Sequence, residues 1–322
     1  MSKGIFICGR KPATDASSLA SGMRYASCRA IAGSDFALWC LLAALWGSSF
    51  LAIGIGVRTL GIFELVTGRT VIGAALLIAV VVAVDGSLRL TPRGWLLAAI
   101  VGLTGNVIPF LLISFAEQHV DTGLAALIMG LAPIATLSLA PLVHPDETLT
   151  SGKMIGGALG LGGLTLLVGP DAFGGLGSNL IAQVALVLAA LCYAATALIS
   201  RRFAYPEPLQ MAAASVLVAA LTTGAMCLSG GDNPGLHSPS LGSLLAVVYL
   251  GIGPTALAAI IYFRLIPRIG ATALQQVNYV VPVLGTVLGI LFLRERPTWN
   301  AMLAIPVVLL AIRLVTRSVH RG

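Results

Sequence analysis

Residues 45–50 read LWGSSF and residues 192–197 read CYAATA, so that Tyr193 follows Trp46 after 147 positions. Nearly the same spacing separates four further pairs in unchanged order: Phe115 and Phe263, Gly123 and Gly270, Pro133 and Pro282, and Glu147 and Glu295. Because five landmarks keep their order and almost their register, we predict an internal duplication. The two related halves are expected at residues 36–169 and 178–317.

The composition is typical of a membrane protein. Hydrophobic residues make up 57% of the 322-residue chain, charged residues only 10%, and the mean hydropathy is +0.98. A soluble domain carries roughly 25% charged residues, and this chain has too few to cover a surface that faces water. Several apolar runs reach the roughly 20 residues that a helix needs to cross a bilayer. We therefore predict an all-α protein embedded in the lipid bilayer.

Ten apolar spans fit between residues 36 and 317. Turn-forming residues separate them, and the expected spans are 36–57, 63–84, 94–115, 121–143, 152–169, 178–200, 207–228, 241–263, 270–293 and 298–316. Residues 1–34 are basic and rich in Ser and Ala, and they are expected to form a disordered cytosolic tail. A transit peptide is the alternative for this segment, and Met23 is an alternative start to Met1.

Basic residues predict the orientation of the chain in the membrane. With the N-terminus in the cytosol and the loops assigned alternately, fifteen of the nineteen Lys and Arg lie inside; the others are Arg58, Arg69, Arg294 and Arg296. Both termini of a multi-pass inner (plasma) membrane protein are therefore expected in the cytosol. Each half has five spans, an odd number, so the second half enters from the opposite side and the repeat is inverted. The net charge of +7 follows from this topology and does not indicate a nucleic-acid partner.

Inverted repeats of membrane helices are a recurring construction of secondary transporters, which bind a solute between the halves. Other function classes lack their usual signals here. The five cysteines form no CxxC pair and no Cys/His cluster, so no metal site or cofactor is expected. A channel needs rings of charge or carbonyl-lined loops, and an intramembrane enzyme needs a buried nucleophile with a base. Neither pattern is visible in the sequence.

The ninth span carries the clearest polar stripe, formed by Gln275, Asn278, Tyr279 and Pro282. Their spacing of i, i+3, i+4 and i+7 places all four on one face of a continuous helix. Two amides and a phenol that face one way suit hydrogen bonding to a polar solute. The alternative is hydrogen bonding between helices, because amides also join membrane helices to one another.

Aromatic and proline residues add further candidates. Trp46 lies deep in the first span, away from the interface where Trp usually anchors, and Tyr193 is its counterpart in the other half. They are expected to form walls of the solute cavity, with core packing as the alternative. Asn106 lies beside Pro109 in the third span. Pro133 and Pro282 lie inside matching helices, where a proline removes a backbone hydrogen bond, and they are expected to be hinges or static kinks.

Charged residues within or at the ends of spans are candidates for gating. Arg69 is the basic residue well inside a span, and Glu64 lies five residues before it. We expect a structural or gating ion pair between them, with snorkelling of Arg69 or contact with an anionic substrate as alternatives. Glu147 and Glu295 end the fourth and ninth spans on opposite membrane faces, where they are expected to cap the following helices or to latch a gate.

These features resemble the drug/metabolite transporter superfamily, in its ten-helix EamA-type branch. The resemblance covers residues 36–316 and depends on five segments: residues 46–50, Arg69, residues 125–147, residues 156–169 and residues 271–295. It implies two inverted five-helix repeats around a central cavity and export of amino acids, metabolites or drugs. Two departures stand out. Residues 144–146 read HPD before Glu147, where the family often has a Gly, and the first span lacks the Glu that small multidrug relatives use for proton coupling.

The sequence therefore predicts an exporter of small polar or amphipathic metabolites, working by alternating access, and not an enzyme. The solute is expected to contact Trp46, Asn106, Tyr193, Gln275, Asn278 and Tyr279. A sugar-phosphate or nucleotide-sugar antiporter is the main rival, although such a carrier should need several basic residues in its cavity. The expected partners are a small-molecule solute and the lipid bilayer, with a homodimer as one option for assembly.

Overall fold

A computed structural model describes residues 33–120, 122–144, 149–169, 176–229, 239–281, 283–284 and 299–318. Throughout these residues every regular element is a helix. The helices are α1 (Gly33–Gly56), α2 (Ile62–Asp85), α3 (Pro92–Gly102), η2 (Leu103–Val107), α4 (Ile108–Ala116), α5 (Thr122–Met129), α6 (Leu131–Val143), α7 (Ser151–Val168), α9 (Leu180–Arg202), α10 (Pro208–Leu228), α11 (Leu241–Leu250), η3 (Gly251–Leu257), α12 (Ala258–Ile269), α13 (Ala271–Gln275) and α15 (Trp299–Ser318).

The helices are long and apolar enough for a membrane protein. Among the described residues, seven helical stretches meet the length and hydropathy needed to cross a bilayer, and a shorter apolar helix covers Met302–Val315. The seven stretches match the first to fourth and sixth to eighth expected spans, while α7, α13 and α15 occupy the positions of the fifth, ninth and tenth. The predicted all-α membrane fold is confirmed.

Some of the predicted features lie outside the described residues. They are Pro282, Glu147, Glu295, residues 285–293 of the ninth span, and the basic tail except its last two residues, which begin α1. The predicted roles of these residues stay predictions.

Local capping chemistry explains where several helices begin and end. The side chains of Thr91, Asn179 and Ser240 each accept a hydrogen bond from a backbone N–H in the first turn of α3, α9 and α11, at 3.1 Å in each case. Such caps satisfy backbone donors that the helix itself leaves free. Helix α2 ends at Gly86, whose φ of 78° favours glycine.

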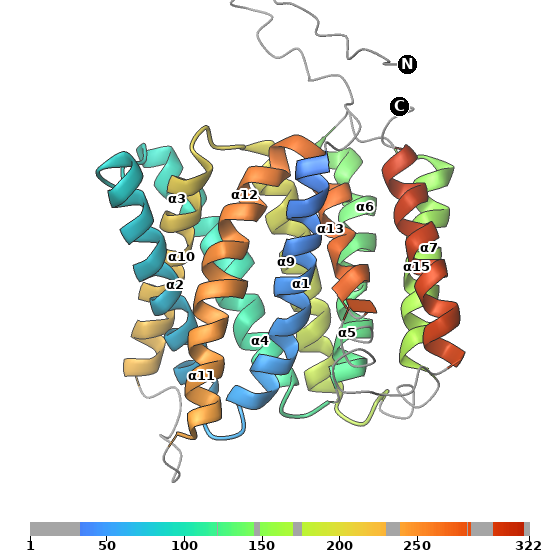
Figure 1. Ribbon diagram of the computed structural model, residues 1–322, viewed down its shortest axis with the longest axis horizontal. Helices are drawn as coiled ribbons and strands as arrows, with labels where there is room; N and C mark the ends of the chain where they lie inside the picture. Colours follow the sequence, from blue (N-terminus) through green and yellow to red (C-terminus); the bar gives the residue numbers. More distant parts are fainter. Residues whose placement is uncertain are drawn as a thin grey trace, which may run out of the picture.

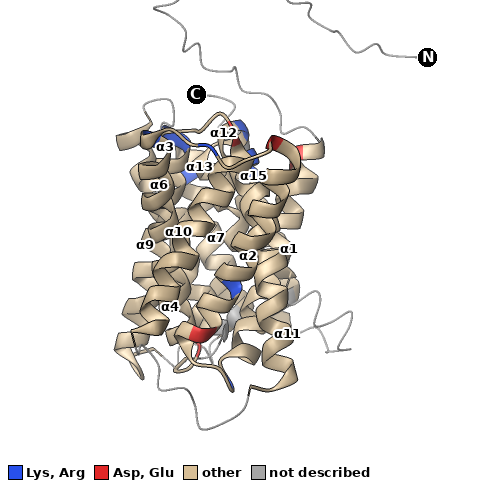
Figure 2. Ribbon diagram, turned by 90° about the vertical axis from the view of Figure 1, so that its left-hand side faces the viewer, with Lys and Arg blue, Asp and Glu red and all other residues tan. Residues whose placement is uncertain are grey.

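The two halves run through the bundle in opposite directions. Helix α1 begins at the upper edge in Figure 1, whereas α9, its counterpart in the second half, begins at the lower edge. The last described helix, α15, ends at the edge where α1 begins. Lys and Arg residues gather at this same edge (Figure 2). A basic position, drawn in blue, also lies deep within the bundle.

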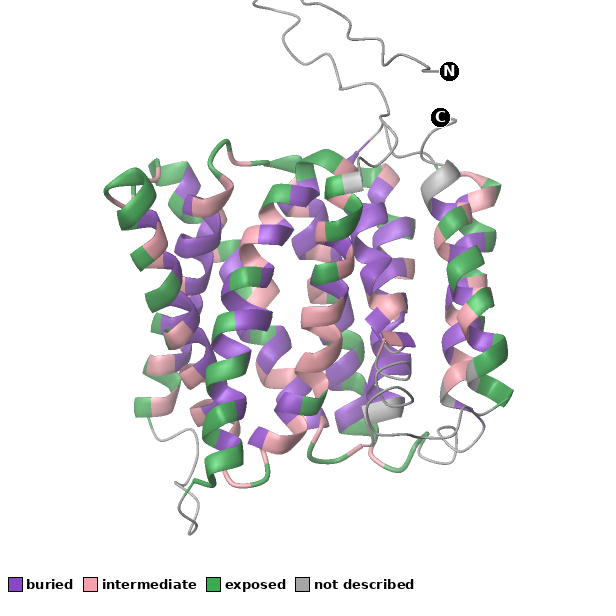
Figure 3. Ribbon diagram, in the orientation of Figure 1, coloured by how far each residue is buried: buried purple, intermediate pink, exposed green. Residues whose placement is uncertain are grey.

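The halves are interleaved rather than side by side. Helix α1 packs against α11 and α12 of the second half, and α9 packs against α4 and α6 of the first half. Helix α2 packs against α10, and α7 against α15, so these contacts also join the two halves. Buried residues lie toward the centre of the bundle and exposed ones on the outward faces of the helices (Figure 3). The outward faces are apolar too, with Leu142 81% and Leu228 91% exposed, as expected for surfaces that contact lipid.

Helical irregularities recur at the repeat spacing. The π-helices η2 and η3 begin at Leu103 and Gly251, which are 148 residues apart. Pro109 follows η2 and Pro254 lies inside η3, and a proline cannot donate the usual helical hydrogen bond. The fourth span is interrupted at Gly130, one turn before Pro133, and the ninth at Gln276. Each half thus contains a π-helix and a helix break at corresponding places.

Close packing between α7 and its neighbours gives the first prediction. A Cβ atom on Gly160 would overlap the Tyr279 ring, whereas one on Gly162 would meet nothing within 4 Å. We expect Gly160→Ala to lower the stability of the purified protein by about 1–3 kcal/mol through overpacking. The matched Gly162→Ala should be neutral or slightly stabilising because alanine favours helix. Thermal melting in detergent measures both, and equal melting temperatures for the two variants would contradict this packing.

Candidate functional site

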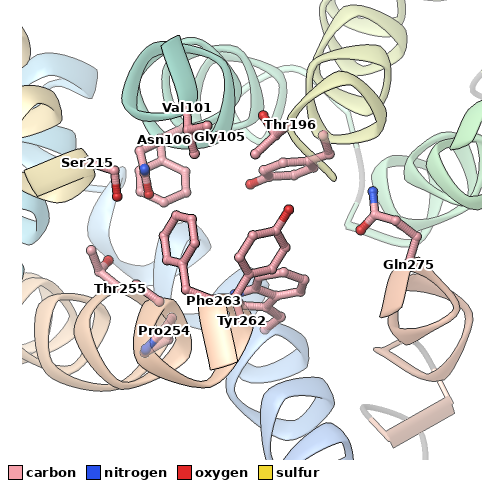
Figure 4. Close-up of a pocket in the computed structure, with 14 residues that line it drawn as sticks. Val101, Gly105, Asn106, Thr196, Ser215, Pro254, Thr255, Tyr262, Phe263 and Gln275 are labelled. Atoms are coloured by element: carbon pink, nitrogen blue, oxygen red, sulfur yellow. The ribbon is translucent and has the colours of Figure 1, made fainter. Parts of the chain in front are cut away.

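Two cavities lie in the middle of the bundle, and both are lined by residues from both halves. We call them the Gln275 cavity, shown in Figure 4, and the Arg69 cavity. Residues from α1, α3, η2, α4, α9, α10, η3, α12 and α13 line the Gln275 cavity. The Arg69 cavity lies among α1, α2, α4, α5, α9 and the start of the segment after α13.

An aromatic cluster separates the two cavities. Trp46, Phe110 and Tyr193 line both of them, and we call these three residues the aromatic partition. The rings of Trp46 and Tyr193 are stacked, with centroids 6.3 Å apart and planes 14° from parallel. Tyr262 extends the cluster, since its ring centroid lies 6.1 Å from that of Trp46. The walls predicted from the repeat, Trp46 and Tyr193, therefore meet each other at the centre.

Irregular helices present polar side chains and backbone to the Gln275 cavity, whose lining is otherwise mostly aromatic and apolar. Asn106 and Gly105 come from η2, and Pro254 and Thr255 from η3. Within membrane helices, non-standard backbone is tolerated where it lines a cavity or is buried in protein, and π-helical turns occur often at functional sites. The predicted candidate Asn106 thus lines the cavity beside the matching irregularity of the other half.

Other polar groups of this cavity come from α9, α10 and α13. Thr196 donates a hydrogen bond to the Thr104 hydroxyl at 2.7 Å, joining α9 to η2. Ser215 lines the same cavity. Gln275 is 2% exposed, and its side-chain Nε2 has no hydrogen-bond partner among the described residues. A buried amide without a partner is costly, so Gln275 offers an unused donor to a bound solute.

The Arg69 cavity contains a buried cation. Arg69 is 2% exposed, and its guanidinium carbon lies 3.7 Å from the centroid of the Phe110 ring. Its Nε donates a hydrogen bond to the Thr255 hydroxyl at 3.1 Å. Because Thr255 lines the Gln275 cavity and Phe110 belongs to the aromatic partition, Arg69 is connected to both cavities.

Two glycines allow the close crossing of α2 and η3 that brings Arg69 to Thr255. A Cβ atom on Gly73 would lie 2.8 Å from the Thr255 methyl group, and one on Gly251 would lie 2.7 Å from Ile72. Small residues commonly let membrane helices approach each other in this way. Larger side chains here would separate the two helices and break the contact.

The expected ion pair between Arg69 and Glu64 is wrong for this structure. The Glu64 carboxylate instead accepts a hydrogen bond from the backbone N–H of Gly61 at 3.0 Å and caps its own helix. Residues five apart differ in direction by about 140° around a helix, so the two side chains point to different sides. Arg69 also does not snorkel to the surface, because its side chain lies against Phe110 in the interior.

The polar stripe of the ninth span is split by the helix break. Gln275 lines one cavity and Asn278 the other, with the Asn278 amide donating to the Gln275 carbonyl at 3.3 Å. Tyr279 lines neither of these cavities. It is fully buried and donates to the Gly157 carbonyl of α7 at 3.1 Å. Tyr279 does not share a cavity with Gln275 or Asn278, because α13 ends before Gln276 and the continuous helical phase is lost. Its contact with the solute stays a prediction.

Sequence reasoning also missed some lining residues. Phe110, Thr196 and Ser215 line the Gln275 cavity, and of these Thr196 could have been found because it follows Tyr193 by three residues on one helix face. Pro133 lines neither cavity, although Met129, just before the break at Gly130, lines the Arg69 cavity. Within the described residues, no group of three His, Cys, Asp or Glu side chains gathers to hold a metal ion.

The contact between Thr255 and Arg69 gives the second prediction. Thr255→Val keeps the side-chain shape but removes the hydroxyl that accepts from the buried guanidinium. We expect a loss of about 1–3 kcal/mol in stability, since a buried charged donor loses its partner. Thr222→Val is the matched control, because the Thr222 hydroxyl bonds only to the Val218 carbonyl of its own helix. Thermal melting measures both; a Thr255→Val protein as stable as the control would contradict the contact.

The chain is similar to known membrane proteins over nearly its whole length. It is 26% identical over 296 residues to YedA of Escherichia coli (strain K12), described as an uncharacterized inner membrane transporter, covering 91% of this chain and 93% of that one. It is 24% identical to a probable terminal-alkyne amino-acid exporter of Streptantibioticus cattleyicolor, covering 87% and 93%. One solved crystal structure matches its fold with a TM-score of 0.74 at 24% identity, covering 89% of this chain and 98% of that one.

The comparison with protein families agrees with the duplication. The EamA-like transporter family matches the chain twice, at residues 36–169 and at residues 180–317. These two matches place one family repeat in each of the oppositely directed halves, with the cavities between them. The chain is a multi-pass inner-membrane transporter, and it belongs to the EamA-like transporter family.

Proposed function

We propose that the protein exports small polar or amphipathic metabolites, amino acids or drugs among them, by alternating access. The observation that carries this proposal is the pair of cavities on either side of the aromatic partition, each lined by both halves. A solute bound between inverted repeats can be exposed to one side or the other when one half rocks against its partner.

The order of events follows from the position of the partition. The solute enters the Gln275 cavity, where the amides of Asn106 and Gln275 and the hydroxyls of Thr196 and Ser215 supply donors and acceptors. The partition blocks direct passage. When the halves rock, the stacked rings of Trp46 and Tyr193 separate, because one belongs to each half, and the solute passes to the Arg69 cavity.

The direction of export depends on the orientation of the chain. Basic residues of the loops and helix ends support a cytosolic location for the edge where α1 begins. The described ones are Arg89, Arg93, Lys153, Arg201, Arg202, Arg264, Arg268, Arg313 and Arg317. An excess of Lys and Arg marks the cytosolic side of membrane proteins. The Gln275 cavity then lies nearer the cytosol and the Arg69 cavity nearer the outside, with both termini in the cytosol.

The composition of the cavities does not favour the sugar-phosphate or nucleotide-sugar alternative. Arg69 is the one Lys or Arg among the described residues that line either cavity. A phosphate carries close to two negative charges at neutral pH and is commonly held by several basic groups. The relative described as a probable amino-acid exporter supports smaller and less charged solutes.

Counterflow in proteoliposomes tests the proposal. Protein in vesicles preloaded with amino acids, nucleosides and small metabolites is exposed to the same compounds in labelled form. We expect solute-specific exchange by the wild type and at least about a tenfold loss in Asn278→Ala, which corresponds to about 1.4 kcal/mol. Asn300→Ala is the matched control, because Asn300 is an exposed amide on the outer helix α15.

Two other outcomes of the counterflow experiment would contradict part or all of the proposal. Exchange that survives Asn278→Ala at the wild-type rate would contradict the assigned site while leaving transport intact. The absence of exchange for every compound, from protein shown to be folded by its melting transition, would contradict the proposed function itself.

A further inference from the structure

Arg69 is a buried cation whose charge has no described counter-ion. It makes no ion pair with any described carboxylate, whereas Arg268 pairs with Asp35 at the surface. A guanidinium has five N–H donors, and the hydrogen bond to Thr255 uses only the one on Nε. The donors of the two terminal nitrogens are therefore left for another partner, and Arg69 lines a cavity.

Two neighbouring side chains hold this charge in place. Burying an ion without a partner is strongly unfavourable, and charged residues inside membranes usually mark substrate or ion pathways. The Phe110 ring and the Thr255 hydroxyl offset part of the cost by a cation–π contact and a hydrogen bond. Both also orient the guanidinium, so that its terminal nitrogens form a fixed fork. Such a fork matches the two oxygens of a carboxylate.

The surroundings of Arg69 limit the charge and shape of the ligand. Among the described lining residues no second Lys or Arg accompanies Arg69, so the cavity suits one negative charge rather than two. Asn278 and Ser49 add neutral polar groups. The remaining described walls are aromatic or apolar; besides Phe110 and Tyr193 of the aromatic partition they are Trp46, Phe50, Ile53, Ile113, Met129 and Val281. They suit a solute with an apolar or aromatic body.

We propose that the solute is an organic acid with a single carboxylate and an apolar or aromatic body, and that Arg69 binds this carboxylate in the Arg69 cavity. This inference rests on the proposed transport function and names the chemical class of its substrate. An α-amino group is not required, because no carboxylate is found among the described residues lining either cavity to pair with it.

Paired probe compounds that share a body and differ in charge test the charge requirement. Purified protein in a non-ionic detergent is melted with benzoate, phenylacetate, 3-phenylpropionate and hexanoate, each beside its primary amide, and with phenyl phosphate. A ligand that binds only the folded state raises the melting temperature. We expect at least one carboxylate to raise it by about 2–4 °C, while its amide and phenyl phosphate do not.

Three variants assign the effect to Arg69. The carboxylate effect should vanish in Arg69→Gln and be reduced in Arg69→Lys, which keeps the charge but loses the planar fork. Arg58→Gln, which removes an exposed arginine, should keep the full effect. If Arg69→Gln does not fold, the comparison of each carboxylate with its amide in the wild type and in Arg69→Lys still decides whether Arg69 binds the carboxylate.

The inference is overturned if no carboxylate stabilises the wild type more than its amide does, or if Arg69→Gln responds as the wild type does. Its failure is distinguishable from failure of the transport proposal. Counterflow of a neutral solute that is retained in Arg69→Gln and lost in Asn278→Ala would leave the transporter standing and exclude the carboxylate. Counterflow of an organic acid that disappears in Arg69→Gln but persists in Arg58→Gln would support both.

Discussion

The constraint on which this structure depends is the absence of water inside the bilayer. Every backbone N–H and C=O within the hydrocarbon must find a partner in the protein, so a chain of this composition crosses as helices. Departures from helix are tolerated only where protein or a cavity surrounds them. The described departures follow that rule, since η2 and η3 line the Gln275 cavity and the breaks at Gly130 and Gln276 lie beside residues of one cavity or the other.

Because the repeat is duplicated and inverted, the helical irregularities of the two halves lie on opposite sides of one cavity. Because the halves run in opposite directions, η2 and η3 approach the centre from equivalent positions and face each other across the Gln275 cavity. Interleaving of the halves then places Trp46 of the first against Tyr193 of the second. The contacts that would have to change during transport are therefore contacts between the halves, whereas each half keeps its own hydrogen-bonded helices.

The two cavities differ chemically although the repeats are related. Both cavities have mostly aromatic and apolar walls, but the polar groups of the Gln275 cavity are neutral amides and hydroxyls, whereas the Arg69 cavity contains one buried cation. The position of α10 that corresponds to Arg69 in the repeat is occupied by an apolar residue, Leu217. Sequence divergence between the halves has thus given the two cavities different polar groups.

Composition and periodicity were sufficient to predict the membrane class, the helical fold and the inverted halves, because the bilayer permits few alternatives and hydrophobic length is a local property. They also indicated that Trp46 and Tyr193 correspond, because this follows from spacing alone. The assignment of side chains to cavities depended on helical phase, which is lost where a helix breaks, and Tyr279 packs against α7 after such a break. The partner of Arg69 lies 186 residues away at Thr255. Only the tertiary structure decides such a contact, because it depends on the crossing of α2 with η3 rather than on either segment by itself.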